Sequence, residues 1–330
     1  MLRKALIAAL CICSTTLAQW SQLKDLEPTG GKIVLTESHN LWEPAMLDEL
    51  ARVCGHETIG GIWDTETIFD GRVARAKAQG AKLMALWSPY HKNDGTKPAI
   101  PGYVTDQIPM PIGIEPSLGH YLWMVNRANT IRGWLLAEDA FPLFAGNLLD
   151  NEVWHVNLKQ NAVHLPTIES LQVTYASTLR SILPGGQHWY GACGWGGTKQ
   201  NQPQYFHTVN AVNAMGNKQA SIVDYSVSQC RGAEIASELA STYGSTASAT
   251  WGRSVWITLT ADYTDASKGW DVDACLPEDV VRTKINDLET NVAPTLWIVY
   301  VSSFDNDNPD IFAERLAWLV EEIAPEVPQE

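Results

Sequence analysis

The stretch GKIVLTESHNLWEPAMLDELARVCGHETIGGIWDTE (31–66) contains the smallest repeating unit of this chain. Two short apolar runs, 31–39 and 58–66, flank the segment 45–54, whose composition is typical of a helix. Each run is too short for a free-standing helix and is followed by polar residues, which favours a buried parallel strand. The stretch therefore predicts a strand–helix–strand unit.

The same alternation continues along almost the whole chain. Six more runs follow, with helix-like segments between them: AKLMALWSP (81–89), IRGWLLAED (131–139), QHWYGACGW (187–195), ASIVDYSVS (220–228), SVWITLTAD (254–262) and TLWIVYVSS (295–303). Eight alternations predict an α/β fold, a single (β/α)8 (TIM) barrel, in which functional residues lie where the strands run out into the following loops. We expect long loops after the third and fourth strands, at 88–116 and 140–165, to wall a cleft.

The first residues, 1–18, resemble a secretory signal peptide. Arg3 and Lys4 form a basic start, an apolar stretch follows, and Thr16-Leu17-Ala18 is a small-residue cleavage site. A membrane anchor is the less favoured alternative, because the apolar stretch is far shorter than the ~20 residues that span a bilayer. We expect cleavage near Ala18, one barrel domain over 19–330, and a secreted protein.

The acidic balance limits the partners of this chain. Its formal net charge is −14 at pH 7, and the loss of Arg3 and Lys4 makes it more negative. Binding to nucleic acid or to an anionic membrane surface needs clusters of Lys and Arg, so both are disfavoured. The Gly-rich segment GACGWGG (191–197) has neither the Lys of a phosphate loop nor the spacing of a dinucleotide site. We expect a monomer without a cofactor or a metal ion.

Four cysteines remain after cleavage: Cys54, Cys193, Cys230 and Cys275. An even number in an exported protein permits two disulfides, and no CxxC spacing indicates a zinc site. Cys230 and Cys275 follow the sixth and seventh runs, so they belong to neighbouring loops on one face of the barrel. A Cys230–Cys275 disulfide is the first choice, and reduced, buried thiols are the alternative.

Carboxylates recur at the predicted strand ends. They are Glu37, Asp64, Glu66, Glu138, Asp139, Asp224, Asp262, Asp265 and Asp305. Carboxylates that converge on one rim raise one another's pKa, and a protonated acid beside an ionised base is what glycoside hydrolysis needs.

Glu138 is the first candidate for the catalytic acid. It ends the apolar run WLLA, and Trp134, Leu136 and Phe141 supply apolar neighbours that would raise the pKa of its carboxyl group. Asp262, at the end of the seventh run, or Asp224, in the sixth, is the candidate nucleophile or base. Position favours Asp262. The structural alternatives are a helix-capping or solvated carboxylate for Glu138, an internal ion pair or a bond to a backbone amide for Asp224, and a turn residue for Asp262.

Aromatic residues support a carbohydrate as the substrate. The chain has 14 Trp, and several lie at or near predicted strand ends, although others within strands serve only packing. A sugar packs its C–H face on an indole ring, while its hydroxyl groups bond to carboxylates and imidazoles. The candidate substrate-binding residues are Glu37, His39, Asp64, Trp63, Trp87, His91, Asp139, Trp195, Tyr263 and Trp270.

With these residues in place, the chain resembles a secreted (β/α)8-barrel glycoside hydrolase. The largest clan of retaining barrel enzymes carries an Asn-Glu pair after strand four and a Glu after strand seven. At the matching positions this sequence has Ala137-Glu138 and Asp262. The resemblance implies hydrolysis of O-glycosidic bonds in a poly- or oligosaccharide.

Two other functions fit the same pattern. One is a non-catalytic barrel that binds carbohydrate. The other is a metal-dependent hydrolase that uses Glu37, His39 and Asp64, although the sequence has no HxH or HExxH spacing.

Overall fold

The computed structural model describes residues 20–36, 42–61, 64–87, 118–151, 177–184, 187–193, 220–223, 254–257, 259–265, 270–275, 277–291, 293–301, 305 and 307–323. Eight strands form one sheet: β1 (Ile33–Leu35), β2 (His56–Gly60), β3 (Lys82–Trp87), β4 (Phe144–Asn151), β5 (Gln187–Cys193), β6 (Ala220–Val223), β7 (Ser254–Ile257) and β10 (Leu296–Val299). Their order is β1-β10-β7-β6-β5-β4-β3-β2, and every hydrogen-bonded pair is parallel.

Side chains of β2 bring the two ends of this sheet together. The Thr58 hydroxyl donates to the carbonyl oxygen of Leu35 in β1 at 2.6 Å. The His56 ring lies 3.1 Å from the carbonyl oxygen of Ile33, and its Nδ1–H donates because a carbonyl only accepts. The strands therefore close into a (β/α)8 barrel, as the sequence predicts.

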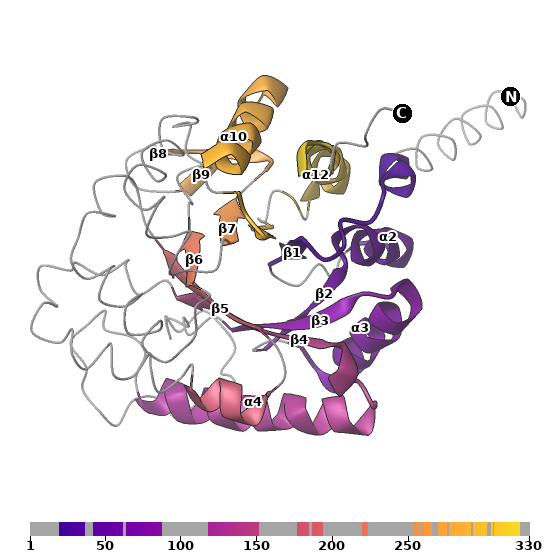
Figure 1. Cartoon of the computed structure of the whole chain (residues 1–330), viewed down its shortest axis with the longest axis vertical. Coiled ribbons are helices and arrows are strands. Elements are labelled where there is room, and N and C mark those ends of the chain that lie inside the picture. Colours follow the sequence, from indigo (N-terminus) through magenta and orange to yellow (C-terminus); the bar gives the residue numbers. More distant parts are fainter. Residues whose placement is uncertain are drawn as a thin grey trace, which may run out of the picture.

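The described helices lie on the outside of the barrel (Figure 1): α2 (Pro44–Cys54), α3 (Glu66–Gln79), α4 (Leu118–Ala137), α10 (Glu278–Asn291) and α12 (Pro309–Ile323). Two short 3-10 helices, η1 (Ser21–Asp25) and η2 (Phe141–Leu143), precede β1 and β4. Local sequence sets the ends of the first helices. Pro44 begins α2, the Thr65 side chain caps α3, and Gly55 and Gly80 end them in the left-handed conformation. In the described part of the chain, no helix is long and apolar enough to cross a bilayer.

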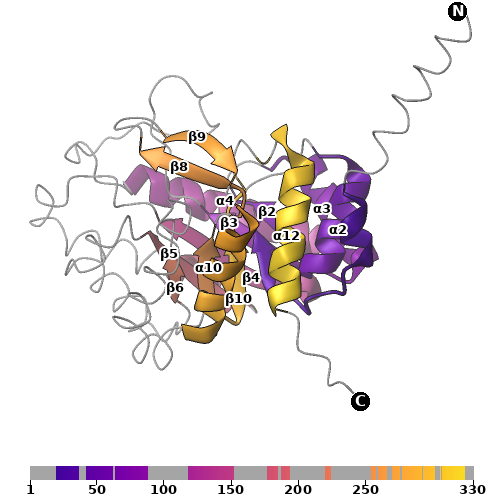
Figure 2. The ribbon, with the colours of Figure 1, turned by 90° about the horizontal axis from the view of Figure 1, so that it is seen from above.

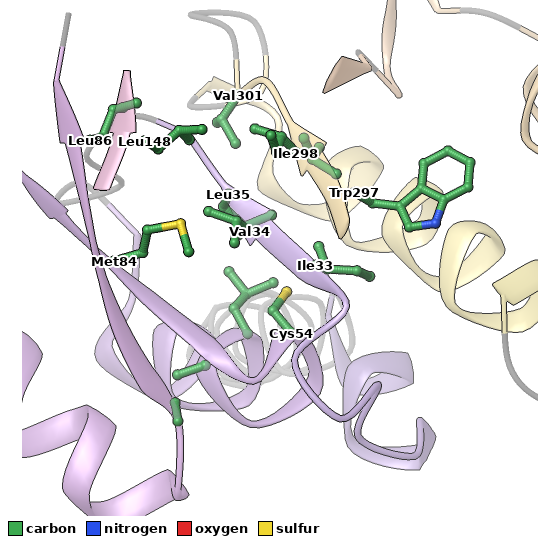
Figure 3. Close-up of a cluster of buried hydrophobic side chains, with 14 of the residues drawn as sticks. Ile33, Val34, Leu35, Cys54, Met84, Leu86, Leu148, Trp297, Ile298 and Val301 are labelled. Carbon is green, nitrogen blue, oxygen red and sulfur yellow. The ribbon is translucent and has the colours of Figure 1, made fainter. Parts of the chain in front are cut away.

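The interior of the barrel is packed with aliphatic side chains. Figure 3 shows Leu86 of β3, Leu148 of β4 and Ile298 of β10 gathered together, with Trp297 pointing away from them. Leu86 and Leu148 also face each other in the register of β3 and β4. The barrel is therefore a filled core, and access for a ligand is limited to its ends.

The predicted fourth strand, 131–139, is wrong. Most of this run is the last part of α4, and the fourth strand is β4, which lies inside the segment 140–165 predicted as a loop. Ala128, Ile131 and Leu135 are buried, whereas Leu136 is 60% exposed. Burial at every third or fourth residue is the helical period, which the high apolar content of the run concealed.

The seventh strand is shorter than predicted, because β7 ends at Ile257 rather than at 262. After it the chain forms an antiparallel hairpin of β8 (Ala261–Asp265) and β9 (Trp270–Cys275), which is separate from the barrel sheet. Figure 2 shows the hairpin beyond the end of the barrel strands. Asp262 therefore belongs to this hairpin and not to a barrel strand.

Candidate functional site

The carboxyl ends of the barrel strands carry buried polar groups. Thr36 follows β1, Asp64 follows β2, Asn147 lies within β4, and Thr260 and Asp305 follow β7 and β10. All five are at most 1% exposed. Burial of a polar group costs free energy unless it is hydrogen-bonded, so the partners of these groups define what this end of the barrel does.

Asp64 is held inside the protein rather than presented to a ligand. Its Oδ2 accepts a hydrogen bond from the amide of Gly60 at 2.8 Å and lies 2.7 Å from Nε of Arg72. Its Oδ1 accepts from Nη2 of the same arginine at 3.3 Å. Both oxygens are therefore engaged in the contact between β2 and α3, which differs from the predicted role in substrate binding.

The ion pair of Asp64 belongs to a longer charged network. Arg72 also contacts Glu57 at 2.9 Å, and Glu57 lies 3.0 Å from Arg75, which reaches Asp48 of α2. Burial lowers the pKa of Arg72, but the negative charges of Asp64 and Glu57 outweigh burial and raise that pKa above its ordinary value. The network fixes α3 against β2.

Arg127 of α4 holds the turn that follows β2. Its Nε donates to the carbonyl oxygen of Gly61 at 2.9 Å, and its Nη2 donates to the carbonyl oxygen of Asp64. The guanidinium also lies 5.0 Å from the ring centroid of Trp134. Trp63, a predicted substrate-binding residue, lies in this turn by sequence and outside the described residues.

Trp87 is fully buried at the end of β3 and has a structural contact. Its indole N–H donates to the side-chain oxygen of Asn147 at 2.9 Å. Gly61 packs against it so closely that an added Cβ would lie 2.7 Å from the Trp87 ring and from the carbonyl oxygen of Leu86. The described ring is therefore part of the core and offers no free face to a sugar.

On the other side of the barrel, the exits of β7 and β10 are joined. The Thr260 hydroxyl donates to Oδ1 of Asp305, and neither residue is exposed. Beside them, the Val301 amide donates to the Thr36 hydroxyl at 3.4 Å, and the Thr36 amide donates to the carbonyl oxygen of Val299 at 2.8 Å. These contacts give the rim a fixed backbone next to the hairpin.

Glu138 and Asp139 lie at the opposite end of the barrel, in the turn that leads from α4 into β4. The Glu138 carboxylate is 43% exposed and 3.7 Å from Nζ of Lys77, which also donates to the Glu138 carbonyl oxygen. Asp139 is exposed with a φ of 50°. The predicted rim position of both residues is wrong, because it depended on a strand at 131–139.

The remaining predicted site residues divide into two groups. Asp262, Tyr263 and Trp270 lie in the hairpin, and Asp265 pairs with Trp270 in its register. Outside the described residues lie Glu37, His39, His91, Trp195, Asp224 and Cys230. Cys275 is the last residue of β9. Because its suggested partner Cys230 is not described, the Cys230–Cys275 disulfide stays a prediction. Within the described ranges, no three His, Cys, Asp or Glu residues gather as a metal site.

The sequence prediction missed the end of the true fourth strand. β4 ends at Asn151, and the sequence continues with Glu152, which lies outside the described residues. The sequence thus has an Asn-Glu pair at the end of strand four. The tripeptide Asp150-Asn151-Glu152 was visible in the sequence, but Gly146 and Asn147 interrupt the apolar run that would have marked the strand.

Known structures with a similar fold were found, but no family model and no curated protein sequence matches this chain. The PgaB (BpsB) glycoside hydrolase domain from Bordetella bronchiseptica is similar with a TM-score of 0.52 and 8% identity, over 86% of this chain and 98% of that one. GH5_18 from Streptomyces cattleya in complex with GlcNAc has a TM-score of 0.49 and 14% sequence identity, over 86% of this chain and 75% of that one. A GH5-4 broad-specificity endoglucanase from an uncultured bacterium has a TM-score of 0.48 and 10% sequence identity, over 93% of this chain and 96% of that one. At 8% identity, the similarity to the PgaB (BpsB) domain supports the barrel fold alone.

Proposed function

We propose that this protein is a glycoside hydrolase that cleaves O-glycosidic bonds of a poly- or oligosaccharide with two carboxyl groups. Three observations support the proposal. The fold is a (β/α)8 barrel, a similar barrel is described as a glycoside hydrolase domain, and acidic residues follow several strands at the carboxyl end. The third observation matters most, because fold alone does not determine function.

The observation that carries the proposal is the position of Asn151-Glu152. An Asn-Glu pair after strand four is the pattern of the largest clan of retaining barrel enzymes, and β4 ends at Asn151. In the proposed mechanism, Glu152 protonates the glycosidic oxygen as its bond to the sugar breaks. It then removes a proton from the water that completes hydrolysis. Glu152 takes the role that the sequence first suggested for Glu138.

The second carboxylate is proposed to be Asp224 or Asp262. Asp224 comes directly after the last residue of β6, and Asp262 is the second residue of β8. Either one would act as the nucleophile in a retaining reaction or as the base that activates water in an inverting one. A carboxyl separation of about 5–5.5 Å from Glu152 implies retention, and about 6.5–9.5 Å implies inversion.

We also propose that the protein is exported, after removal of residues 1–18. The signal-like sequence and the even number of remaining cysteines support this. Expression with the intact N-terminus, followed by N-terminal sequencing of the released protein, tests it. A released chain that begins near Gln19 is expected, and retention of Met1 in released protein contradicts it.

The direct test is an activity screen that compares two glutamates on either side of β4. Wild type, Glu152→Gln and Glu138→Gln are assayed for reducing ends released from carboxymethylcellulose, xylan, mannan, starch and chitosan. We expect the Glu152 variant to lose about 10²–10⁴-fold of the rate, which is the usual contribution of a general acid–base group. The Glu138 variant is the matched control and should keep wild-type activity.

Two results would overturn the proposal. Equal activity of the Glu152 variant and wild type would remove Glu152 from the mechanism. A wild-type protein that is folded and inactive on the whole panel, but is bound by one of its polysaccharides, would favour a non-catalytic carbohydrate-binding barrel instead.

A further inference from the structure

The hairpin β8–β9 is an insertion at the carboxyl end of the barrel, between β7 and α10. Its five paired positions are antiparallel and lie outside the barrel sheet. An isolated two-stranded hairpin is at best marginally stable in water, so its placement depends on what holds its base. The register shifts between Asp262 and Tyr263, as in a β-bulge, which bends a strand and increases its twist.

A side-chain contact between described residues holds the base of the hairpin. Thr260 directly precedes β8, and its hydroxyl donates to the Asp305 carboxylate. Asp305 follows β10, the barrel strand beside β7. Both side chains are completely buried, and Leu259 next to Thr260 is 1% exposed. A hydrogen bond to a carboxylate is stronger than one between neutral groups, so this contact fixes where the hairpin leaves the barrel.

The backbone around this contact is also fixed. The amide of Tyr300, directly after β10, donates to the carbonyl oxygen of Ile257, the last residue of β7, at 2.8 Å. The chain is therefore held at Ile257 by the backbone directly after β10, and at Thr260 by Asp305. The backbone contact continues the barrel ladder, whereas the Thr260 contact lies directly before the first strand of the hairpin.

The sequence of the hairpin suits a carbohydrate chain. Between 261 and 275 it contains two aromatic residues, Tyr263 and Trp270, and four aspartates. Aromatic rings give a sugar a face to pack against, and carboxylates accept hydrogen bonds from its hydroxyl groups. A basic ligand would use the aspartates without the aromatic rings.

We propose that Thr260 and Asp305 are positioning residues that hold the β8–β9 hairpin at the carboxyl end of the barrel, where it binds part of the carbohydrate substrate. This rests on the proposed function, since it takes the ligand to be a polysaccharide. Neither residue touches the sugar. Their contact acts on affinity through the hairpin. The proposal takes Glu152 and Asp224 as the carboxylates that break the bond, since Asp262 lies in the hairpin itself.

The test uses Thr260→Val, which keeps the shape of the side chain and removes the donor, and Thr260→Ser, which restores it. Thr58→Val is the matched control, because Thr58 is also a buried threonine whose hydroxyl donates to a fixed oxygen, but in β2. Hydrogen exchange of the backbone amides is measured in all four full-length proteins. Native gels that contain each polysaccharide of the panel measure their binding. All assays are made where circular dichroism reports a folded protein.

The first readout concerns the hairpin alone. We expect Thr260→Val to speed exchange of the amides at 261–275 by about tenfold or more, with the strands β1 to β4 still protected. Thr260→Ser should restore protection, and Thr58→Val should change β1 and β2 instead. Unchanged exchange at 261–275 in Thr260→Val would overturn the proposal whatever the protein hydrolyses.

The second readout concerns binding. We expect Thr260→Val to weaken retardation by the bound polysaccharide about tenfold, a typical scale for a lost hydrogen bond to a charged group. With Asp224 as the second carboxylate, the rate at saturating polysaccharide should stay near that of wild type. Thr58→Val should bind normally. Faster exchange with unchanged binding would reject the role in substrate binding. Absence of retardation of wild type by every polysaccharide would reject it as well, while the exchange result would still decide the anchoring role.

Discussion

The two ends of the barrel use charged residues in different ways. At the amino end, Glu138 and Lys77 are each nearly half exposed and lie 3.7 Å apart. At the carboxyl end, Asp64 and Asp305 are completely or almost completely buried, and each accepts a hydrogen bond from a fixed donor. Exposed pairs add little to stability, whereas a buried charge is tolerated only with close partners. The difference indicates that the carboxyl end of the barrel has the fixed arrangement of polar groups.

The largest effect on stability is expected from Asp64. Asp64→Ala removes a partner from the buried Arg72 and should lower the free energy of unfolding by about 3–5 kcal/mol. Glu138→Ala is the matched control at the other end and should change it by less than about 1 kcal/mol. Urea denaturation of both variants measures this. Equal losses would remove the difference between the two ends.

The close packing behind the carboxyl end is tested at Gly61. Gly61→Ala places a methyl group 2.7 Å from the Trp87 ring and should lower the free energy of unfolding by about 1–3 kcal/mol. Gly71→Ala in α3 has open space at the same atom and should raise it by about 0.5–1 kcal/mol. Thermal denaturation distinguishes the two signs. An unchanged free energy of unfolding in Gly61→Ala would mean that the Trp87 ring can shift to make room for the methyl group.

The contact between Trp87 and Asn147 should have an effect of about the same size or smaller. Asn147→Leu keeps a similar volume but leaves the buried indole N–H without its acceptor, which costs about 1–3 kcal/mol. In Trp87→Phe with Asn147→Leu both polar groups are absent, so part of the loss should be recovered. Unfolding curves of the single and double variants measure the coupling, and strictly additive losses would contradict it.

The smallest effect is a pH dependence that arises at the amino end. Burial lowers the pKa of His56 below its ordinary value of 6.5, so the unfolded chain binds a proton more readily than the folded one. The stability contributed by neutral His56 is complete above about pH 6.5 and is lost as the pH falls below it. In His56→Gln, this contribution to the change of unfolding free energy with pH should disappear. Urea titrations made from pH 7 downward measure it. An unchanged slope would assign the acid sensitivity to other groups.

Seven of the eight strands could be predicted because short runs rich in apolar residues and followed by polar ones are typical of strands in a parallel sheet. The fourth could not, for reasons that lie in particular residues. Asn147 breaks the run in β4 because it is the acceptor for Trp87, and that contact joins two separate strands. The run at 131–139 looked equally apolar, although Leu136 faces solvent on a helix. The error moved the leading catalytic candidate to the wrong end of the barrel.

By itself, the sequence determined the repeating strand–helix pattern, the helix caps and the acidic character, since these depend on neighbouring residues and on composition. The tertiary structure decided which carboxylates serve packing and which end of a strand each one occupies. The sequence predicts Asp64 as a rim residue that binds substrate. In the structure, Arg72 and the Gly60 amide contact its carboxylate oxygens instead. In the sequence, Asp305 is one of several acidic residues near strand ends. Only the structure shows that it accepts a hydrogen bond from Thr260, 45 residues away. Such pairings depend on closure of the barrel, which brings distant segments together and leaves no trace in local sequence.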